Sequence, residues 1–213
     1  MKLTLYYSPI SCSMVPWIAL TEAGAGFDVQ VLDFKRGAHM SPEFLRVNPR
    51  HRVPVLLVDG DPLTENVAIQ LWIARHFPTA GLLPDGDMAE FKAISLMAWC
   101  ASGIHPHLTP NILPQRYCDL PESESAVRRC AHRMLQENFA VAEERLAGRQ
   151  WFFDRFTLPD AYFFWCFRRA TQFNVDLAAF PECRAHFQRV SERDSVVRLL
   201  KFEADTMAAL AAG

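Results

Sequence analysis

The sequence predicts a small mixed α/β sheet followed by an all-helical region, and two observations support this fold class. In roughly the first third of the chain, short segments with strand-like alternation are interleaved with helix-like segments. Beyond Phe77 no clear strand alternation returns, and apolar residues recur at three- to four-residue spacing. A chain of 213 residues is longer than one typical domain. The predicted fold class is therefore α/β plus all-α.

Three strands and a hairpin are expected in the first part. Lys2–Tyr7 alternates, Val29–Leu32 is a second candidate, and Val53–Val58 is a buried strand that turns back at Asp59–Pro62. The intervening helices are Ser13–Glu22, Pro42–Val47 and a segment that follows Thr64. The order β-α-β-α, then a hairpin, then a helix predicts a mixed sheet of about four strands.

The domain boundary is expected where proline and glycine accumulate between Phe77 and Asp87. We predict one domain over residues 1–78, a linker over 79–87 and a helical domain over 88–213. The helices of the second domain are predicted at Met88–Ile104, Ser123–Leu146, Leu158–Ala170, Pro181–Arg193 and Ser195–Ala211.

Composition narrows the range of functions. Lys plus Arg number 22 against 24 Asp plus Glu, with no long block of one sign, so a nucleic-acid partner is not expected. The apolar runs Val53–Val58 and Ala161–Phe167 are far shorter than the roughly 20 residues that span a bilayer. The N-terminal residues also lack the apolar core of a signal peptide. We therefore expect a cytoplasmic protein with no membrane segment.

The cysteines point in the same direction. They form no CxxC pair and show no repeated spacing. The six positions are Cys12, Cys100, Cys118, Cys130, Cys166 and Cys183. This pattern disfavours a zinc site and a secreted disulfide framework. We expect reduced thiols and no metal.

Cys12 is the first candidate for chemistry, because it lies between a predicted strand and the first turn of a helix. Unpaired backbone N–H groups at a helix N-terminus stabilise an anion, so the position favours a thiolate with a lowered pKa. The neighbouring hydroxyls of Ser11 and Ser13 can donate hydrogen bonds to sulfur, which makes Ser11 a second catalytic candidate. The alternative is a small, packed cysteine without a chemical role.

Two further segments suit a peptide-like ligand. Pro54 starts a strand, and a cis Val53–Pro54 bond would leave the Val53 backbone free to pair with an extended peptide; the alternative is an ordinary trans proline. Glu65 and Asn66 stand at a strand-to-helix junction. Backbone N–H groups there can hold a carboxylate while Glu65 holds an ammonium group, unless the segment is a simple N-cap.

A helix-capping signal precedes the apolar run at residues 161–167. Thr157 can cap, Pro159 is tolerated in the first turn, and Asp160 occupies the position of the capping-box acid. We expect a structural role for this segment.

Taken together, these segments resemble the glutathione transferase superfamily over essentially the whole chain. The run Tyr6-Tyr7-Ser8-Pro9-Ile10-Ser11-Cys12-Ser13 is most similar to the bacterial beta class. Asn48-Pro49 with Val53-Pro54-Val55 resembles the family's cis-proline segment, and Leu63-Thr64-Glu65 with Val67-Ala68-Ile69 resembles its γ-glutamyl-binding turn. The resemblance implies a thioredoxin-like first domain, a helical second domain and glutathione as cosubstrate.

The resemblance also implies a role for each candidate residue. Val53, next to Pro54, would pair its backbone with the cysteinyl part of glutathione, while Glu65 and Asn66 would hold the γ-glutamyl ammonium and carboxylate. Cys12 would face the glutathione sulfur and could form a mixed disulfide with it. Among the cations Lys35, Arg36 and Arg52, we rank Arg52 and Lys35 first for the glycyl carboxylate.

His105 matches the position of a beta-class histidine that faces the glutathione thiol, which would make it a catalytic residue. The alternatives are a packing or capping role, or a metal site with His107, for which no further ligand lies at helical spacing. Pro106 departs from the family pattern. Together, Pro106, Pro110 and Pro114 predict a broken helix here.

The expected function is a homodimeric, detoxifying glutathione transferase that joins glutathione to small apolar electrophiles, with thiol–disulfide exchange through Cys12 as a further activity. The dimer would use the Thr64–His76 and Met88–Ile104 helices. The electrophile would lie between Ile10, residues 108–117 and the helix face of Phe163, Phe164, Phe167 and Arg168. An aromatic stripe at helical spacing is, however, more often core than pocket. The alternatives are a non-enzymatic binding member of the same fold, or a dedicated glutathione-dependent dehalogenase, ether-cleaving enzyme or isomerase.

Overall fold

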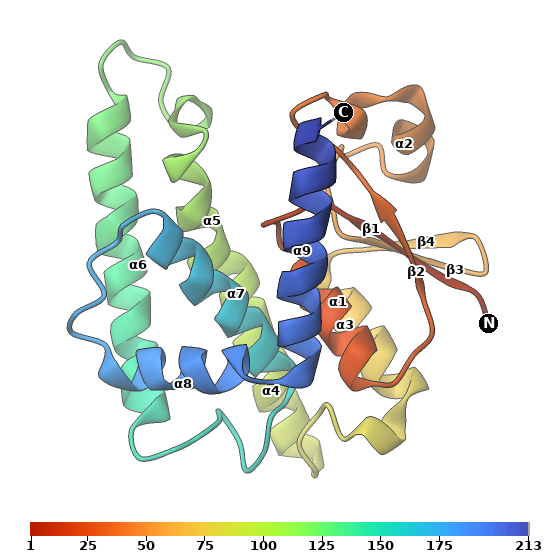
Figure 1. Cartoon of the computed structure of the whole chain (residues 1–213). Coiled ribbons are helices and arrows are strands. Elements are labelled where there is room, and N and C mark those ends of the chain that lie inside the picture. Colours follow the sequence, from red (N-terminus) through yellow and green to blue (C-terminus); the bar gives the residue numbers. More distant parts are fainter. Residues whose placement is uncertain (213) are drawn as a thin grey trace. The chain divides into compact units, whose positions relative to one another are not determined.

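The computed structural model describes residues 1–212, which form two compact units (Figure 1). Unit 1 contains Met1–Leu82 together with the chain from Glu192 onward, and unit 2 contains Leu83–Ser191.

Unit 1 is built on a four-stranded sheet in the order β2-β1-β3-β4. The strands are β1 (Leu3–Tyr7), β2 (Asp28–Val31), β3 (Val55–Val58) and β4 (Asp61–Thr64). β1 pairs with β2 in parallel and with β3 antiparallel, and β3 pairs antiparallel with β4. The predicted mixed sheet and its hairpin are confirmed.

The hairpin between β3 and β4 turns on two residues with positive φ. Asp59 has a φ of 51° and Gly60 a φ of 94°. Of the two-residue hairpin turns, type I′ needs this left-handed backbone at both positions, which asparagine, aspartate and glycine tolerate best. The Asp59 N–H also donates to the Lys2 carbonyl over 2.9 Å, which ties the turn to the start of β1.

Helices cover both faces of the sheet. On one face α2 (Pro42–Val47) packs its buried Phe44 against Leu32, Val53 and Val55. On the other lie α1 (Met14–Glu22) and α3 (Asn66–His76), which pack on each other (Figure 1). Short 3₁₀ turns at Ala38–Met40 and Pro78–Ala80 complete the connections.

The last helix, α9 (Asp194–Ala212), belongs to unit 1. It packs on α1, where Phe202 stacks on Trp17 with ring centroids 6.2 Å apart. At its start, the Arg193 guanidinium binds both carboxylate oxygens of Glu22 at 2.8 and 2.6 Å, and the Ser195 hydroxyl also donates to Glu22. The units therefore divide the chain differently from the predicted 1–78, 79–87 and 88–213.

Unit 2 is helical, as predicted, and its main helices are α4, α6, α7 and α8. Their bounds are Asp87–Trp99, Glu124–Leu146, Leu158–Gln172 and Pro181–Ser191. α7 lies in the core of this unit: Phe163 and Phe164 are fully buried and Phe167 is 3% exposed. This aromatic stripe is therefore core, the alternative that its helical spacing favoured.

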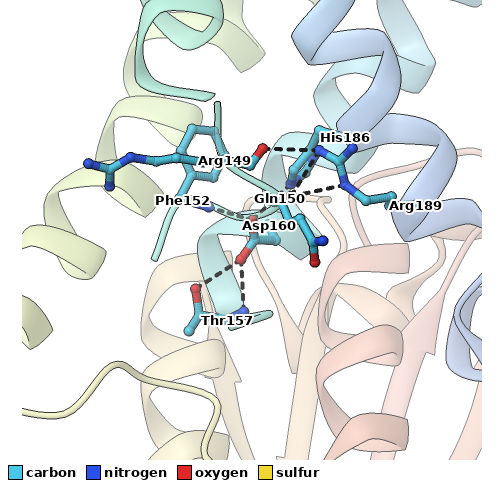
Figure 2. A network of polar contacts seen from close by, with 7 residues as sticks. All are labelled: Arg149, Gln150, Phe152, Thr157, Asp160, His186 and Arg189. Atoms are coloured by element: carbon cyan, nitrogen blue, oxygen red, sulfur yellow. Dashed lines mark hydrogen bonds and ion pairs between the residues drawn. The ribbon is translucent and has the colours of Figure 1, made fainter. Parts of the chain in front are cut away.

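The start of α7 carries a buried polar network (Figure 2). One oxygen of Asp160 accepts from the backbone N–H and the hydroxyl of Thr157, which completes the predicted capping box. The other oxygen accepts from the Phe152 N–H at 3.1 Å and faces His186 Nε2 at 2.8 Å. Asp160 and His186 are both fully buried.

The proline-rich stretch after α4 consists of short helical segments. A π-helical turn at Cys100–Ile104 follows α4 directly and continues into α5 (His105–Leu108) and a 3₁₀ turn at Thr109–Asn111. The first real departure from helical backbone is Leu113, with φ −131° and ψ 60°, before a 3₁₀ turn at Pro114–Arg116. The stretch is therefore divided into short helical pieces, as the three prolines predicted, but the chain leaves helical backbone only before Pro114 and not at Pro106. Pro106 has no N–H to donate, and it enters the helix just after a widened turn.

No helix within residues 1–212 combines the length and the apolar character needed to cross a membrane.

Candidate functional site

The loop between β1 and α1 carries Cys12 and is held by its own serines. The hydroxyls of Ser11 and Ser13 lie 2.6 Å apart, and the Ser11 hydroxyl donates to the Ser8 carbonyl at 2.7 Å. The Ser13 hydroxyl accepts from the Ser8 N–H at 3.1 Å. These serines therefore stabilise the loop backbone, whereas the sequence predicted that they would donate to the Cys12 sulfur.

Cys12 itself is buried, and its thiol donates to the carbonyl oxygen of Val53 over 3.4 Å. Burial raises the pKa of Cys12 to about 12, although a backbone hydrogen bond, Asn66 and Arg52 all act to lower it. The expected low-pKa thiolate is therefore wrong for this geometry. The helix N-terminus is present, but removing the sulfur from water outweighs it.

Val53 and Pro54 lie beside Cys12 at the start of β3. The Val53–Pro54 peptide bond is cis, and both residues are buried. The Val53 carbonyl accepts a hydrogen bond from the Cys12 thiol. The Val53 N–H donates no backbone hydrogen bond in the loops of residues 1–212. The Asn48 side chain donates to the Arg52 carbonyl at 2.7 Å and fixes the segment just before Val53.

The β4–α3 junction presents one acid and buries one amide. Glu65 has a φ of 69°, which projects it from the start of α3, and two thirds of its side chain is exposed. Its carboxylate lies 2.6 Å from Nη1 of Arg50. Asn66 is buried and donates from Nδ2 to the Cys12 carbonyl at 3.2 Å, and its Oδ1 has no partner. Asn66 thus ties α3 to the Cys12 loop.

The three candidate cations differ in their surroundings. Arg36 lies 3.7 Å from a carboxylate oxygen of Asp33. Lys35 and Arg52 are exposed, and neither has an ion pair within the described residues. Of the three candidates, Lys35 and Arg52 thus form no ion pair within residues 1–212, and these two were expected first for the glycyl carboxylate.

Glu203 is a buried acid near this loop that sequence reasoning missed. It lies on α9, is 3% exposed, and accepts from the Ile10 N–H at 2.6 Å and from the Tyr7 hydroxyl at 3.3 Å. Ile10 has a φ of 66°, so Glu203 holds a left-handed turn two residues before Cys12. A lone acid on the apolar face of the last amphipathic helix was the available signal.

A groove of about 170 Å³ opens next to the same loop within unit 1. Its floor and walls are mostly apolar, and Phe34 and Met207 are partly exposed there. The residues that line it are Ser8, Pro9, Ile10, Leu32, Asp33, Phe34, Lys35, Met207, Leu210 and Ala211. The groove combines a hydrophobic wall with the ammonium group of Lys35.

His105 begins α5 in unit 2. Its Nδ1 lies 3.2 Å from the Tyr162 hydroxyl, and its ring meets the Trp165 ring edge to face with centroids 4.4 Å apart. His107 is partly buried, and this burial lowers its pKa even though the charge of Glu137 acts to raise it. Nowhere in residues 1–212 do three His, Cys, Asp or Glu side chains gather as metal ligands would.

Two family models match the chain. Residues 1–75 match the glutathione S-transferase N-terminal domain, and residues 100–194 match the glutathione S-transferase C-terminal domain. The two matches correspond to the sheet-containing first part of the chain and to most of the helical second part.

Individual relatives cover nearly the whole chain. The glutathione S-transferase GstA of Escherichia coli O157:H7 is 32% identical over 93% of this chain and 98% of its own. A maleylacetoacetate isomerase of Rhizobium meliloti is 30% identical over 85% of this chain and 87% of its own. The solved structure of a sphingomonad glutathione S-transferase complexed with glutathione superposes with a TM-score of 0.83 at 31% identity, covering 94% and 98% of the two chains.

Proposed function

The chain belongs to the glutathione S-transferase family, and from this premise we propose that it conjugates glutathione to small apolar electrophiles. Catalysis would stabilise the glutathione thiolate near neutral pH and hold it beside the electrophile. A helix N-terminus and a hydrogen bond each contribute about 1 kcal/mol, so a thiol pKa lowered by roughly one to two units is expected.

One observation carries the proposal: Cys12, Val53 and Asn66 are linked by direct hydrogen bonds in unit 1. Each comes from a different segment that the resemblance assigns to glutathione binding. The cis Val53–Pro54 bond and the exposed carboxylate of Glu65 belong to the same segments. Val53 would pair with the cysteinyl part of the tripeptide through its backbone, and Glu65 would bind its ammonium group.

Asn66 would contribute through its backbone. Its side-chain amide is already used on the Cys12 carbonyl, but the N–H groups at the start of α3 have no partner within the helix. Those N–H groups suit the γ-glutamyl carboxylate. Lys35 and Arg52 remain the candidates for the glycyl carboxylate.

The raised pKa of Cys12 favours a mechanism in which Cys12 donates a hydrogen bond over one in which its own thiolate attacks. A thiol with a pKa of about 12 is a neutral S–H donor at pH 7. We propose that Cys12 turns this proton from the Val53 carbonyl to the glutathione thiolate, whose own sulfur attacks the electrophile. His105 would also act at the glutathione thiol, a role that rests on the resemblance alone.

The groove beside Ile10 and Lys35 is our candidate for the apolar part of the electrophile. A volume of about 170 Å³ suits a ring or a short chain rather than a large substrate. This placement differs from the predicted one, because the aromatic stripe of α7 is core.

Isothermal titration calorimetry with glutathione tests the site. The wild type, Glu65→Ala and the control Glu43→Ala would be compared. Glu43 also forms an exposed ion pair with an arginine, at 3.8 Å, but on α2. We expect micromolar-to-millimolar binding that Glu65→Ala abolishes and Glu43→Ala retains. Failure of the wild type to bind glutathione would contradict the proposal.

Thiol–disulfide exchange through Cys12 is the second candidate activity. It needs the Cys12 thiolate, so at neutral pH it should be slow unless glutathione binding lowers the pKa of this thiol. A mixed disulfide detected by intact mass after incubation with oxidised glutathione would support it.

Isomerase activity is a further alternative, favoured by the similarity to maleylacetoacetate isomerase. Against it, Pro16-Trp17 stands where the zeta-class pattern has a basic residue soon after the serine–cysteine pair. A non-enzymatic role would need none of Cys12, Glu65 or His105. Assays with maleylacetoacetate and with an aromatic halide separate the three alternatives.

We also propose assignment to the beta class, from the run Tyr6–Ser13, together with a cytoplasmic, detoxifying role and a homodimeric state. The exposed Met88 and Phe91 on α4 support an interface between copies of this chain, because both are large apolar side chains at helical spacing. Sedimentation as a monomer at micromolar concentration would contradict the dimer.

A further inference from the structure

The helix that leads to His105 contains one π-turn, and its geometry fixes the backbone of His105. The His105 N–H donates to the Cys100 carbonyl, five residues back, across the turn at Cys100–Ile104. One extra residue in a turn rotates everything that follows by about 100° relative to a continuous α-helix. The π-turn therefore decides on which side of the helix the imidazole lies.

Gly103 is the fourth residue of this turn, and the indole of Trp99 covers it. A Cβ atom at position 103 would lie 2.6 Å from Cδ1 of Trp99 and 3.0 Å from its Nε1. It would also lie 3.2 Å from Oδ1 of Asn138. Contacts this close to a ring require the ring or the backbone to move, so only glycine fits here with Trp99 in place.

The indole cannot move without breaking a hydrogen bond. Trp99 Nε1 donates to Asn138 Oδ1 at 2.7 Å, and Asn138 Nδ2 donates to the Met134 carbonyl at 2.8 Å. Asn138 is thereby fixed on α6, a helix of 23 residues, and it holds Trp99 against the glycine. The chain of contacts runs from α6 through Trp99 to the turn before His105.

Directly after the turn, the His105 side chain contacts two aromatic residues of unit 2. Its Nδ1 lies 3.2 Å from the Tyr162 hydroxyl, and its ring meets the Trp165 ring at 69°. Both partners come from α7. A rotation of His105 by one helical position would separate it from both.

We propose that Trp99, Gly103 and Asn138 form a brace that keeps the π-turn open and so directs His105 toward Tyr162 and Trp165. The three are positioning residues, because they act through His105. Their importance for catalysis rests on the proposed function, in which His105 acts at the glutathione thiol. The brace itself does not depend on that function.

Histidine NMR tests the brace without an activity assay. His105→Asn identifies the His105 ring signals, which the Trp165 ring current displaces. We expect Gly103→Ala to move these signals toward those of an exposed histidine and to leave the other histidine signals in place. The matched control is Ser102→Ala at the next position, where the exposed hydroxyl bonds only to the Ala98 carbonyl.

A second pair of variants covers the case in which Gly103→Ala fails to fold. Asn138→Leu removes the acceptor for Trp99, whereas Asn138→Asp keeps it. We expect Asn138→Leu to reproduce the signal change and Asn138→Asp to restore most of the wild-type position. Unchanged His105 signals in folded Gly103→Ala or Asn138→Leu would overturn the proposal.

Kinetics then connect the brace to catalysis. With an aromatic halide as electrophile, Gly103→Ala should lower kcat about tenfold or more, with the KM for glutathione unchanged. A general loss of structure would alter both constants. Full activity of His105→Asn would contradict the role of His105 in the proposed function. The brace would still be tested independently by the His105 NMR signals.

Discussion

The Cys12 thiol donates a hydrogen bond to the Val53 carbonyl over 3.4 Å, so the sulfur faces the backbone segment expected to bind a tripeptide. A thiol that donates to a neutral carbonyl is protonated. The raised pKa and the hydrogen bond therefore agree on the protonation state of Cys12.

Alkylation should distinguish Cys12 from an exposed cysteine. At pH 7–8 we expect iodoacetamide to modify Cys130, which is exposed, and to leave Cys12 unmodified. Cys12 should react only as the pH approaches its pKa of about 12, since the thiolate is the nucleophile. Peptide mass spectrometry over a pH series measures both sites. Rapid modification of Cys12 at pH 7 would contradict the protonated state.

Cys12→Ala should separate the two chemistries. Disulfide exchange with oxidised glutathione should disappear, because it requires the protein sulfur. Conjugation should fall only about tenfold in kcat/KM, since one hydrogen bond to a thiolate is lost and glutathione supplies its own sulfur. Parallel assays of both reactions make the comparison, and equal loss of both activities would contradict this division of roles.

Arg50→Ala and Glu65→Ala should have opposite effects on glutathione binding. Arg50 holds the Glu65 carboxylate at 2.6 Å, and about two thirds of each side chain is exposed. Removing Arg50 frees Glu65 for the ligand ammonium group, so we expect glutathione to bind equally well or up to about fivefold more tightly. Titration calorimetry at low salt measures this, and weaker binding would show that Arg50 itself contacts the ligand.

Because of Glu22, the stability of unit 1 should change with pH in the acidic range. Although burial raises the pKa of Glu22, hydrogen bonds from Arg193 and Ser195 hold that pKa below the ordinary value. A lowered folded-state pKa stabilises the fold above the unfolded pKa of about 4.3, and this contribution is lost as pH falls through the folded value.

Glu22→Gln should therefore destabilise the protein by about 1–3 kcal/mol at pH 7 and flatten the stability curve below pH 4.3. Urea unfolding at several pH values measures both effects. Asp205→Asn is the control. Asp205 lies on α9, the helix that begins directly after Arg193, and it forms an exposed ion pair with Lys201. An unchanged acid-range slope in Glu22→Gln would contradict the assignment.

Two substitutions in the capping box of α7 should destabilise the protein to different extents. Thr157→Ala should cost about 1 kcal/mol, as for a lost N-cap. Asp160→Ala should cost about 3 kcal/mol or more, because Asp160 also satisfies the Phe152 N–H and buried His186. Denaturant unfolding of the two variants gives the order, and similar costs would show that the His186 contact contributes little.

The sheet could be predicted because its signals are local. Alternation in β1, the buried run of β3 and the Asp59-Gly60 turn each lie within a few residues. The cap at Thr157 is local in the same way. The partner of α9 could not be predicted, because an amphipathic pattern shows that one face is buried without showing against which helix.

The site was predicted only in part, for related reasons. The sequence around Cys12 indicates a helix start, but the depth of its burial depends on Val53 and Asn66, which are distant along the chain. Glu203 is separated from Ile10 by 193 residues. A glycine within the predicted Met88–Ile104 helix does not by itself indicate a π-turn, because the contacts of Gly103 with Trp99 and Asn138 appear only in the structure.

The membership of α9 in unit 1 has a consequence for biosynthesis. Glu22 and Arg193 are 171 residues apart, and the helix that follows Arg193 packs on α1. The sheet-containing unit therefore cannot close until α9 has left the ribosome, whereas residues 83–191 emerge complete beforehand. Until then, the surface of α1 that later receives α9 stays uncovered and offers its apolar side chains to a chaperone.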